Sequence, residues 1–401
     1  MSLEWETKSF SELVDIIGGG TPKTSVDEYW NGNIPWISIK DFNSGQKYIL
    51  NTEKTITELG LNNSSTKLLK KNDIIISARG TVGEVAMIKY EMAFNQSCYG
   101  LKVHDSLNKD FVYYLLKYNI YKLKNMVHGA VFDTITTNTF DNIFVNVPPL
   151  EYQEKISYLL STIDKLIEVK TQENKNLDDL LMSMFKSWFV YFDDVDEFKS
   201  DENLGDIPKS WSVEMLEDYV DFVTGVEPGS KNYHEKPEEN DIPFIRVGDL
   251  GSKDNSVFIE ALLSKNKILK YEDIVLSMDA TIGIVKMGLE GAYSTGMRKL
   301  VLKNDLINKP FLYCLVKSER IQRIIETFAT GTTILHAGKS IKHMNFVLPD
   351  KITMKNFEKI GENVLTQILS NMREIEKLTQ LRDTLLPKLM SGEIDVSKIK
   401  L

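Results

Sequence analysis

Apolar residues gather in short runs along the first part of the chain, and these runs predict β-strands. Three of them are rich in β-branched residues and are bounded by Gly, Asn and Asp, at residues 34–39, 73–77 and 84–88. Residues 111–123 instead place Phe and Tyr side chains at helical spacing and predict an amphipathic helix. Together these elements predict a mixed α/β domain with short strands.

The same order of elements returns about 200 residues further along the chain. Residues 34–37 (IPWI) recur as 242–245 (IPFI), and residues 111–117 (FVYYLLK) recur as 311–317 (FLYCLVK). A repeat of this length is a whole domain plus a connector, not a solenoid unit. The second copy therefore predicts strands at 242–247 and 273–277 and a helix at 311–325. In both copies glycines mark a loop after a first helical segment, at 18–20 and 225–229.

A long helix is predicted after Pro148-Pro149. Its apolar positions alternate at spacings of four and three residues, which is typical of a helix that packs on a partner helix. Lys170 and Asn174 fall on the same seam, where a polar residue often fixes the register of the pair. About 35 residues of helix would form a rod of roughly 50 Å. The apolar seam positions are Ile156, Leu160, Ile163, Ile167, Leu177, Leu181, Met184 and Trp188.

The C-terminal segment repeats this design, with a change of phase expected near Ile375. Its apolar positions are Leu365, Ile368, Met372, Ile375, Leu378, Leu381 and Leu385. The simplest arrangement packs the two long helices on each other as an antiparallel coiled coil, with a globular domain at either end. We expect an α+β fold of two similar mixed α/β domains in a pseudo-twofold arrangement. The expected boundaries are 1–149 and 193–350 for the domains and 150–192 and 351–401 for the helical spacers.

Composition and charge narrow the function. The net charge of −9 argues against a surface that wraps nucleic acid as a whole, so contact with DNA would need local basic faces. Two cysteines cannot form a disulfide framework, and they predict reduced thiols in a cytoplasmic protein. No apolar run approaches the roughly 18 residues that span a bilayer, so we expect no membrane association.

Patterns that resemble catalytic motifs are incomplete. Residues 146–149 (NVPP) resemble the Asn-Pro-Pro-aromatic motif of adenine methyltransferases, but Val147 interrupts it and no glycine-rich cofactor loop precedes it. Gly338-Lys339-Ser340 would need a glycine in place of Thr333 to form a phosphate-binding loop. The five histidines never pair at metal-ligand spacing. We interpret the chain as a non-enzyme without a cofactor or metal site of its own.

Three segments carry a resemblance to a known family. They are residues 146–156 (NVPPLEYQEKI), 184–193 (MFKSWFVYFD) and 385–394 (LLPKLMSGEI). Over essentially its whole length the chain resembles the DNA specificity subunit of type I restriction–modification systems, and residues 18–22 and 75–83 are similar to parts of its target-recognition domains. The second domain departs from the family pattern at 225–228 (GVEP) and 279–280 (DA).

The resemblance implies that each globular domain reads one half of a split, asymmetric site on double-stranded DNA. It also implies that the long helices act as a ruler between the halves and dock two methyltransferase subunits, while restriction and motor subunits join for cleavage. S-adenosylmethionine, ATP and Mg would then be bound by partner subunits. From the residues alone, a stand-alone DNA adenine methyltransferase and a two-headed coiled-coil adaptor for proteins stay open as alternatives.

Candidate DNA contacts follow from residue type and position. Cations and amides hold phosphates, whereas donors such as the arginine fork read base edges. Arg79 is the single arginine of the first domain, and a salt bridge within its loop explains it equally well. Residues 129–137 are the counterpart of the loop that leads to Lys339 and Lys342. The candidates are Lys23, Thr24, Lys40, Arg79 and Thr81 in the first domain and Lys231, Asn232, Arg246, Arg298, Lys339 and Lys342 in the second.

Overall fold

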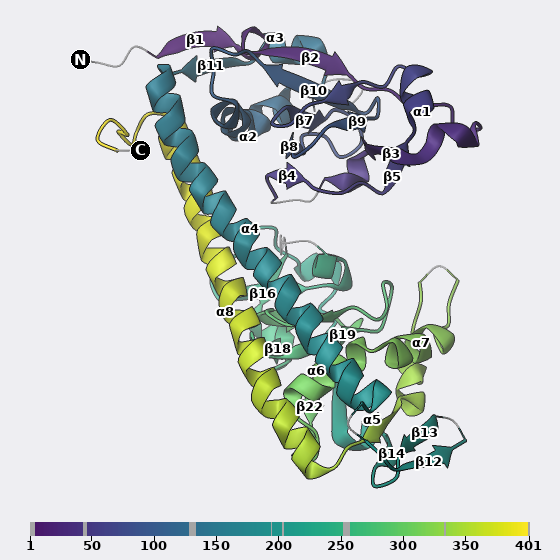
Figure 1. Ribbon diagram of the computed structural model, residues 1–401. Helices are drawn as coiled ribbons and strands as arrows, with labels where there is room; N and C mark the ends of the chain where they lie inside the picture. Colours follow the sequence, from purple (N-terminus) through teal and green to yellow (C-terminus); the bar gives the residue numbers. More distant parts are fainter. Residues whose placement is uncertain are drawn as a thin grey trace. The chain divides into compact units, whose positions relative to one another are not determined.

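The chain folds into two compact units, each with a globular domain and one half of each long helix. Unit 1 comprises Met1–Val169 and Glu376–Leu401, and unit 2 comprises Lys170–Ile375. The structure is a computed structural model (Figure 1). It describes residues 5–42, 46–127, 134–193, 195–202, 204–251, 257–332 and 334–399. The expected domain boundaries differ from this division, because both helices contribute to both units.

Unit 1 is built on two mixed sheets. One has the strand order β2-β10-β7-β8-β4, with β2 (Val14–Gly18), β10 (Cys98–Val103), β7 (Ile74–Ser77), β8 (Val85–Ile88) and β4 (Tyr48–Ile49). The other has the order β5-β3-β9-β6, with β5 (Lys54–Ile56), β3 (Trp30–Ile37), β9 (Met92–Phe94) and β6 (Leu68–Leu69). The remaining elements are the strand pair β1 (Glu6–Ser9) and β11 (Phe144–Val147), and helices α1 (Glu58–Asn62), α2 (Lys109–Val127) and α3 (Thr137–Asp141).

Unit 2 repeats the strand order of unit 1, except that β4 has no counterpart among its described residues. Its first sheet has the order β15-β22-β19-β20, with β15 (Val220–Thr224), β22 (Met297–Leu302), β19 (Ile274–Ser277) and β20 (Val285–Lys286). Its second sheet has the order β17-β16-β21-β18, with β17 (Phe258–Glu260), β16 (Asp241–Ile245), β21 (Gly291–Tyr293) and β18 (Ile268–Leu269). The other elements are the pair β14 (Ser212–Met215) and β23 (Asn345–Leu348), the hairpin β12 (Phe198–Asp201) and β13 (Gly205–Pro208), and helices α5 (Leu216–Tyr219), α6 (Lys309–Lys317) and α7 (Glu319–Thr327).

The burial of the strands explains why their sequences are apolar. All four residues of β7 and all four of β19 are buried, which is the pattern of a strand that is covered on both faces. The expected strands at 73–77, 84–88 and 273–277 are confirmed to within one residue at each end. Trp36 and Phe244 lie in the core as expected, whereas Trp30 is half-buried.

Three local expectations were wrong. Strands β3 and β16 end at Ile37 and Ile245, because the chain turns into short 3₁₀ segments after them. The helix expected at 311–325 is divided into α6 and α7 at Ser318, whose extended backbone (ψ 147°) interrupts it. The glycine loops follow strands β2 and β15 rather than a helix, and only a single helical turn precedes each of these strands.

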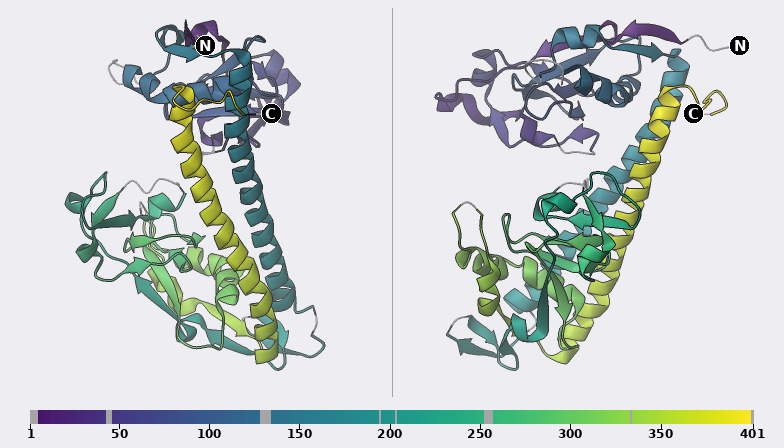
Figure 2. Two further views of the ribbon diagram at one scale, coloured as in Figure 1. Left: turned by 90° about the vertical axis from the view of Figure 1, so that its left-hand side faces the viewer. Right: turned by 180° about the vertical axis from the view of Figure 1, so that it is seen from behind.

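The two long helices, α4 (Leu150–Lys186) and α8 (Lys351–Met390), lie side by side within each unit (Figures 1 and 2). In unit 1 Arg382 of α8 contacts Asp164 of α4, and in unit 2 Asn371 contacts Asn174. Later residues of α8 thus face earlier residues of α4, so the expected antiparallel pairing is confirmed. Among the described residues, no helix has the length and apolar composition needed to cross a membrane.

The seam of α8 differs from the expected one at two positions. Asn371 is fully buried where Met372 was expected, and Met372 is half-buried. Leu381 is 48% exposed, and Arg382 takes the buried place at 6%. The burial pattern of α8 then continues through Ile375, Leu378, Arg382, Leu385 and Leu389 without the expected change of phase. The sequence pattern did not predict the burial of Arg382, because a charged residue at a seam position requires a buried partner and the pattern does not show one.

Candidate nucleic-acid interface

In unit 1 the register of the strands brings several loops to one edge of the domain. Ser77 at the end of β7 pairs with Cys98 at the start of β10, and Gly18 at the end of β2 pairs with Tyr99. In the second sheet, β3 and β9 run parallel and end together at Ile37 and Phe94. The segments that follow these strand ends are therefore neighbours, although they lie far apart in the sequence.

Backbone hydrogen bonds join these segments into one cluster of loops. The amides of Ala78 and Arg79 both donate to the carbonyl of Ser97, at 2.7 and 3.3 Å. The Asn95 amide donates to the Ile37 carbonyl at 2.9 Å, and the Gly20 amide donates to the Phe94 carbonyl at 3.0 Å. We call residues 18–26, 38–42, 78–84 and 95–97 the unit 1 loop cluster.

The segment between β7 and β8 is the most strongly constrained part of this cluster. The Ser77 hydroxyl accepts a hydrogen bond from the Glu84 amide at 2.8 Å and donates to the Thr81 carbonyl. The Gly83 amide donates to the Ser77 carbonyl at 2.9 Å. Gly80 and Gly83 adopt φ values of 74° and 87°, a region that favours glycine. The loop thus holds its own shape and leaves the side chains of Arg79 and Thr81 exposed.

Unit 2 builds the same loop with different side chains. The Ser277 hydroxyl accepts from the Ile284 amide at 2.8 Å, and the Gly283 amide donates to the Ser277 carbonyl at 2.9 Å. Ala280 takes the place of Gly80 and keeps its positive φ, at 60°. Asp279 stands where unit 1 has Arg79, and its carboxylate lies 2.8 Å from the ring of His336.

The candidates in unit 1 all lie in the loop cluster, on its exposed surface. Lys23 and Thr24 are exposed in the turn after β2, which is held by a hydrogen bond from the Trp30 indole to the Lys23 carbonyl at 3.2 Å. The Lys40 ammonium lies 3.6 Å from Glu53, with its side chain 78% exposed. Within the described part of the chain, the Arg79 guanidinium has no ion-pair or hydrogen-bond partner. The alternative of a salt bridge within its loop therefore has no support among the described residues.

Two candidate arginines of unit 2 are held by the protein itself. The Arg246 guanidinium forms two hydrogen bonds of 3.0 Å with the Asp249 carboxylate, which raise its pKa. The Arg298 guanidinium donates to the backbone carbonyls of Thr295 and Met297, and burial lowers its pKa. Part of each donor set is thus already used, which leaves these arginines fewer donors for a base edge.

The other candidates of unit 2 lie on two segments of its surface. Lys231 is exposed, while the Asn232 amide donates to the Pro228 carbonyl and holds its turn. Lys339 and Lys342 are exposed in the 3₁₀ segment Gly338–His343. The counterpart loop of unit 1 falls partly at 128–133, outside the described residues.

Sequence reasoning missed one segment that the structure places in the loop cluster. Residues 95–97 (NQS) connect β9 to β10, and Gln96 hydrogen-bonds Thr21 in the glycine-rich loop. Residues 294–296 (STG) take the same place in unit 2. The available signal was the repeat of Ala-Phe at 93–94 as Ala-Tyr at 292–293, followed in each copy by a polar turn that differs between the copies.

Comparisons with known proteins agree on one family. The model of the type I restriction modification DNA specificity domain matches residues 2–179 and 208–380. The type I restriction enzyme MjaIX specificity subunit of Methanocaldococcus jannaschii is 29% identical over 414 residues, which cover 99% of this chain and 95% of that protein. The HindI specificity subunit of Haemophilus influenzae is 24% identical over 356 residues, covering 71% of this chain and 77% of that protein.

A solved structure has the same fold. The crystal structure of a type I restriction–modification S subunit from M. genitalium superposes with a TM-score of 0.54 at 19% identity, over 97% of this chain and 96% of that chain. The two mixed sheet domains and the packed long helices are therefore a known arrangement, and the fold expected from the sequence is confirmed.

Proposed function

The chain belongs to the type I restriction–modification DNA specificity family, and we propose that each of its units reads one half of a bipartite, asymmetric DNA target. As the specificity subunit of such a system it selects the target, while catalysis belongs to other subunits. The observation that carries the proposal is the repeated loop of β7–β8 and β19–β20. The same hydrogen bonds hold both loops, but one displays Arg79 and the other displays Asp279 paired with His336.

This difference suits two units that recognise different DNA sequences. An arginine fork bonds the O6 and N7 atoms of guanine, whereas an aspartate accepts a hydrogen bond from the N4 amine of cytosine. A fixed backbone with exchanged side chains therefore presents complementary donors and acceptors at equivalent places. Exposed lysines at the margins of these loops would bind phosphates without reading sequence. They are Lys23, Lys40, Lys231, Lys339 and Lys342.

The surface of α4 supports a role in binding partner subunits. In unit 1 its exposed face carries Tyr158, Leu166 and Val169, which are 54%, 44% and 53% exposed. Large apolar side chains in a row on one helix face are typical of a protein–protein contact. We propose that this face docks a methyltransferase subunit, that the paired helices fix the gap between the half-sites, and that S-adenosylmethionine, ATP and Mg bind to the methyltransferase and restriction subunits.

Salt-dependent DNA binding tests this function. A complex of the chain with its methyltransferase subunits should bind its target duplex with an affinity that falls steeply as salt rises, because neutralised phosphates release counterions. Alanine at both Lys339 and Lys342 should reduce the slope of log affinity against log salt by about 2. A complex that forms normally but binds no duplex would instead favour the protein adaptor. Methyl transfer by the purified chain alone would favour a stand-alone methyltransferase.

A further inference from the structure

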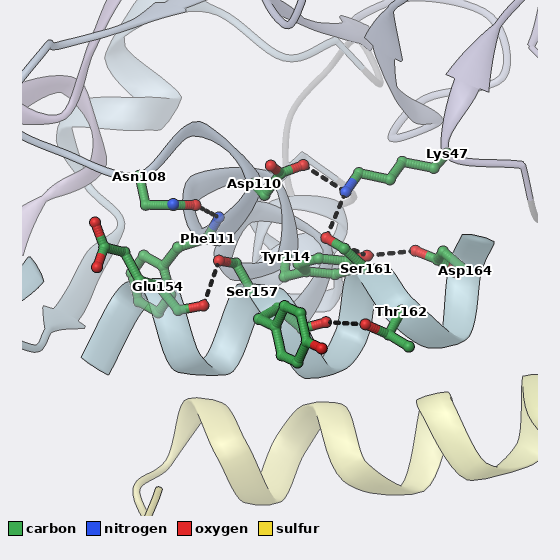
Figure 3. Close-up of polar contacts among 11 residues, drawn as sticks. Lys47, Asn108, Asp110, Phe111, Tyr114, Glu154, Ser157, Ser161, Thr162 and Asp164 are labelled. Atoms are coloured by element: carbon green, nitrogen blue, oxygen red, sulfur yellow. Dashed lines mark hydrogen bonds and ion pairs between the residues drawn. The ribbon is translucent and has the colours of Figure 1, made fainter. Parts of the chain in front are cut away.

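A buried polar cluster in unit 1 joins the globular domain to both long helices. The Tyr114 hydroxyl of α2 donates to the Asp164 carboxylate of α4 at 2.5 Å, and the Arg382 guanidinium of α8 lies 2.9 Å from the same carboxylate. All three side chains are at least nine-tenths buried. Figure 3 shows Tyr114 and Asp164 beside a second contact, in which Lys47 binds Asp110 and donates to Ser161 of α4 at 2.8 Å.

The equivalent positions in unit 2 follow from the repeat. Helix α8 begins 201 residues after α4, at Lys351 against Leu150, and most of the buried positions of the two helices coincide at that offset. Asp164 of α4 therefore corresponds to Leu365 of α8, and Arg382 of α8 corresponds to Leu181 of α4. Tyr114 corresponds to Cys314, because residues 111–117 recur as 311–317.

These three counterparts form an apolar cluster in unit 2. Cys314, Leu365 and Leu181 are 0%, 2% and 0% exposed and belong to one hydrophobic core. The Cys314 sulfur lies 4.0 Å from the Leu181 carbonyl, so α6 contacts the end of α4. Each set of three consists of one residue from a helix of the globular domain, one from the long helix that follows the domain and one from the far end of the other long helix. We call Tyr114, Asp164 and Arg382 the unit 1 triad, and Cys314, Leu365 and Leu181 the unit 2 triad.

We propose that these two triads direct each helix end to its own unit, so that the chain pairs its helices with each other and not with those of a second copy. In a symmetric pairing of two α4 helices, Leu181 of the other copy would take the place of Arg382 and leave the Asp164 carboxylate buried without its cation. In a pairing of two α8 helices, the Arg382 of the other copy would face Leu365 and keep only its ion pair with Asp383 of its own helix, at 2.8 Å. A buried charge that loses an ionic partner is strongly unfavourable, so both symmetric pairings are disfavoured.

A second contact in unit 2 also favours pairing of the two helices of one chain. Asp178 near the end of α4 forms an ion pair of 2.6 Å with Lys317 of α6 and accepts a hydrogen bond of 2.8 Å from the Tyr313 hydroxyl. The equivalent position near the end of α8 is Thr379, which has no charge. Lys317 therefore keeps its partner only when the end of α4 lies in unit 2. The ends of the two helices thus differ at two positions, Asp178 against Thr379 and Leu181 against Arg382.

The first experiment asks whether the two triads are interchangeable. In the full chain, Arg382→Leu alone should lower the thermal unfolding midpoint, because the Asp164 carboxylate loses its cation. The triple variant Tyr114→Cys, Asp164→Leu and Arg382→Leu installs the unit 2 triad in unit 1 and should recover most of that loss. A triple variant as unstable as Arg382→Leu would overturn the proposal, because the triad would then be a requirement of packing.

The second experiment moves the buried arginine from α8 to the equivalent position of α4. The variant Leu181→Arg with Arg382→Leu leaves Asp164 unpaired within one chain but matched to Arg at position 181 of a second copy. Light scattering should show a species of twice the mass of the wild-type chain. Arg382→Leu alone serves as the control of mass, because without an arginine at position 181 a second copy offers the Asp164 carboxylate no cation. A variant with the mass and the unfolding midpoint of the wild-type chain would overturn the proposal. Neither readout involves DNA, so failure here leaves the proposed function untouched.

Discussion

Arg79 and Asp279 occupy the same point of the same loop in the two units and carry opposite charges there. The loop backbone is held by Ser77 in one unit and Ser277 in the other, not by the side chains that it displays. Either displayed residue can therefore be replaced without loss of the loop. At the scale of single residues the specificity of each half is thus separable from its stability.

Replacement of Arg79 by alanine should weaken recognition of one half-site only. We expect a loss of about 1–3 kcal/mol for the cognate duplex and relaxed discrimination at one base pair, as for the loss of a bidentate contact to guanine. Competition binding of the assembled complex, with duplexes varied in one half at a time, measures both effects. Lys102→Ala is the matched control, because this exposed residue lies near the other end of β10 and should change neither half. Altered discrimination in both halves would contradict the assignment.

The contact between His234 and Asp241 gives unit 2 a pH-dependent feature. The hydrogen bond at 2.6 Å raises the pKa of His234 above 6.5 and lowers the pKa of Asp241 below 3.8. The stabilisation from His234 is complete below pH 6.5 and is lost as pH rises through its raised pKa, whereas that from Asp241 is lost as pH falls through its lowered pKa. NMR titration should place His234 above 6.5, and Asp241→Asn should bring it back down; an unchanged titration in that variant would refute the pairing.

The sequence could predict the loops of the candidate site but not the state of their arginines. Arg79 was expected in an exposed loop after a strand, and the structure places it there. Arg246 and Arg298 were likewise candidates for DNA contact, yet Asp249 and two backbone carbonyls bind them. Their partners depend on how the 3₁₀ segment and the strand end turn, and residue type alone does not give those directions.

Among the elements, the two long helices share a layer of hydrogen-bonded polar side chains centred on Asn371, which we call the polar layer. Asn371 is fully buried in unit 2; its amide donates to Asn174 at 2.9 Å, and its oxygen accepts from Lys170 at 3.1 Å and Gln367 at 3.0 Å. Lys170 also lies 3.0 Å from Glu374. The sequence placed Lys170 and Asn174 on the seam, since the heptad spacing runs through them. It could not show which residues of α8 face them, because register depends on the docking of both domains.

Replacement of Asn371 by alanine should destabilise unit 2. The change leaves the Asn174 amide oxygen and the Lys170 ammonium short of a buried partner, which costs about 1–3 kcal/mol. Urea unfolding of the full chain measures the change in the free energy of unfolding. Asn176→Ala is the control, because among the described residues its side chain bonds only Gln172, on the exposed face of α4, and the change should alter stability by less than about 0.5 kcal/mol. Equal effects of the two variants would show that the polar layer is not a determinant of the helix pair.

For the whole molecule, duplication was the property that the sequence predicted best. The repeated strings at 34–37 and 242–245 lie on β3 and β16, which occupy the same place in sheets of the same order. Buried strands and helix seams are constrained by packing, so they remain similar in both copies. The charged triad of unit 1 was not predicted. Its three residues come from segments far apart in the chain, and the sequence alone does not show that they lie together.

A shorter helix pair should change the gap between the half-sites and leave their sequences unchanged. Deletion of residues 167–173 together with 372–378 removes one heptad from each helix and keeps Asn174 opposite Asn371. At 1.5 Å per residue the pair loses about 10 Å, equivalent to roughly three base pairs. Methylation assays on duplexes of graded gap length measure the new optimum. An optimum that stays at the wild-type gap would rule out the helices as the ruler.

The most direct test of the account is a single-molecule map of methylated adenines in cells that express this chain with its partner subunits. We predict one motif made of two unlike short sequences at a fixed gap, in which Arg79→Ala changes one sequence and leaves the other sequence and the gap as they were. A motif with two identical halves, an uninterrupted motif, or a change in both halves would contradict the claim that each unit reads its own half.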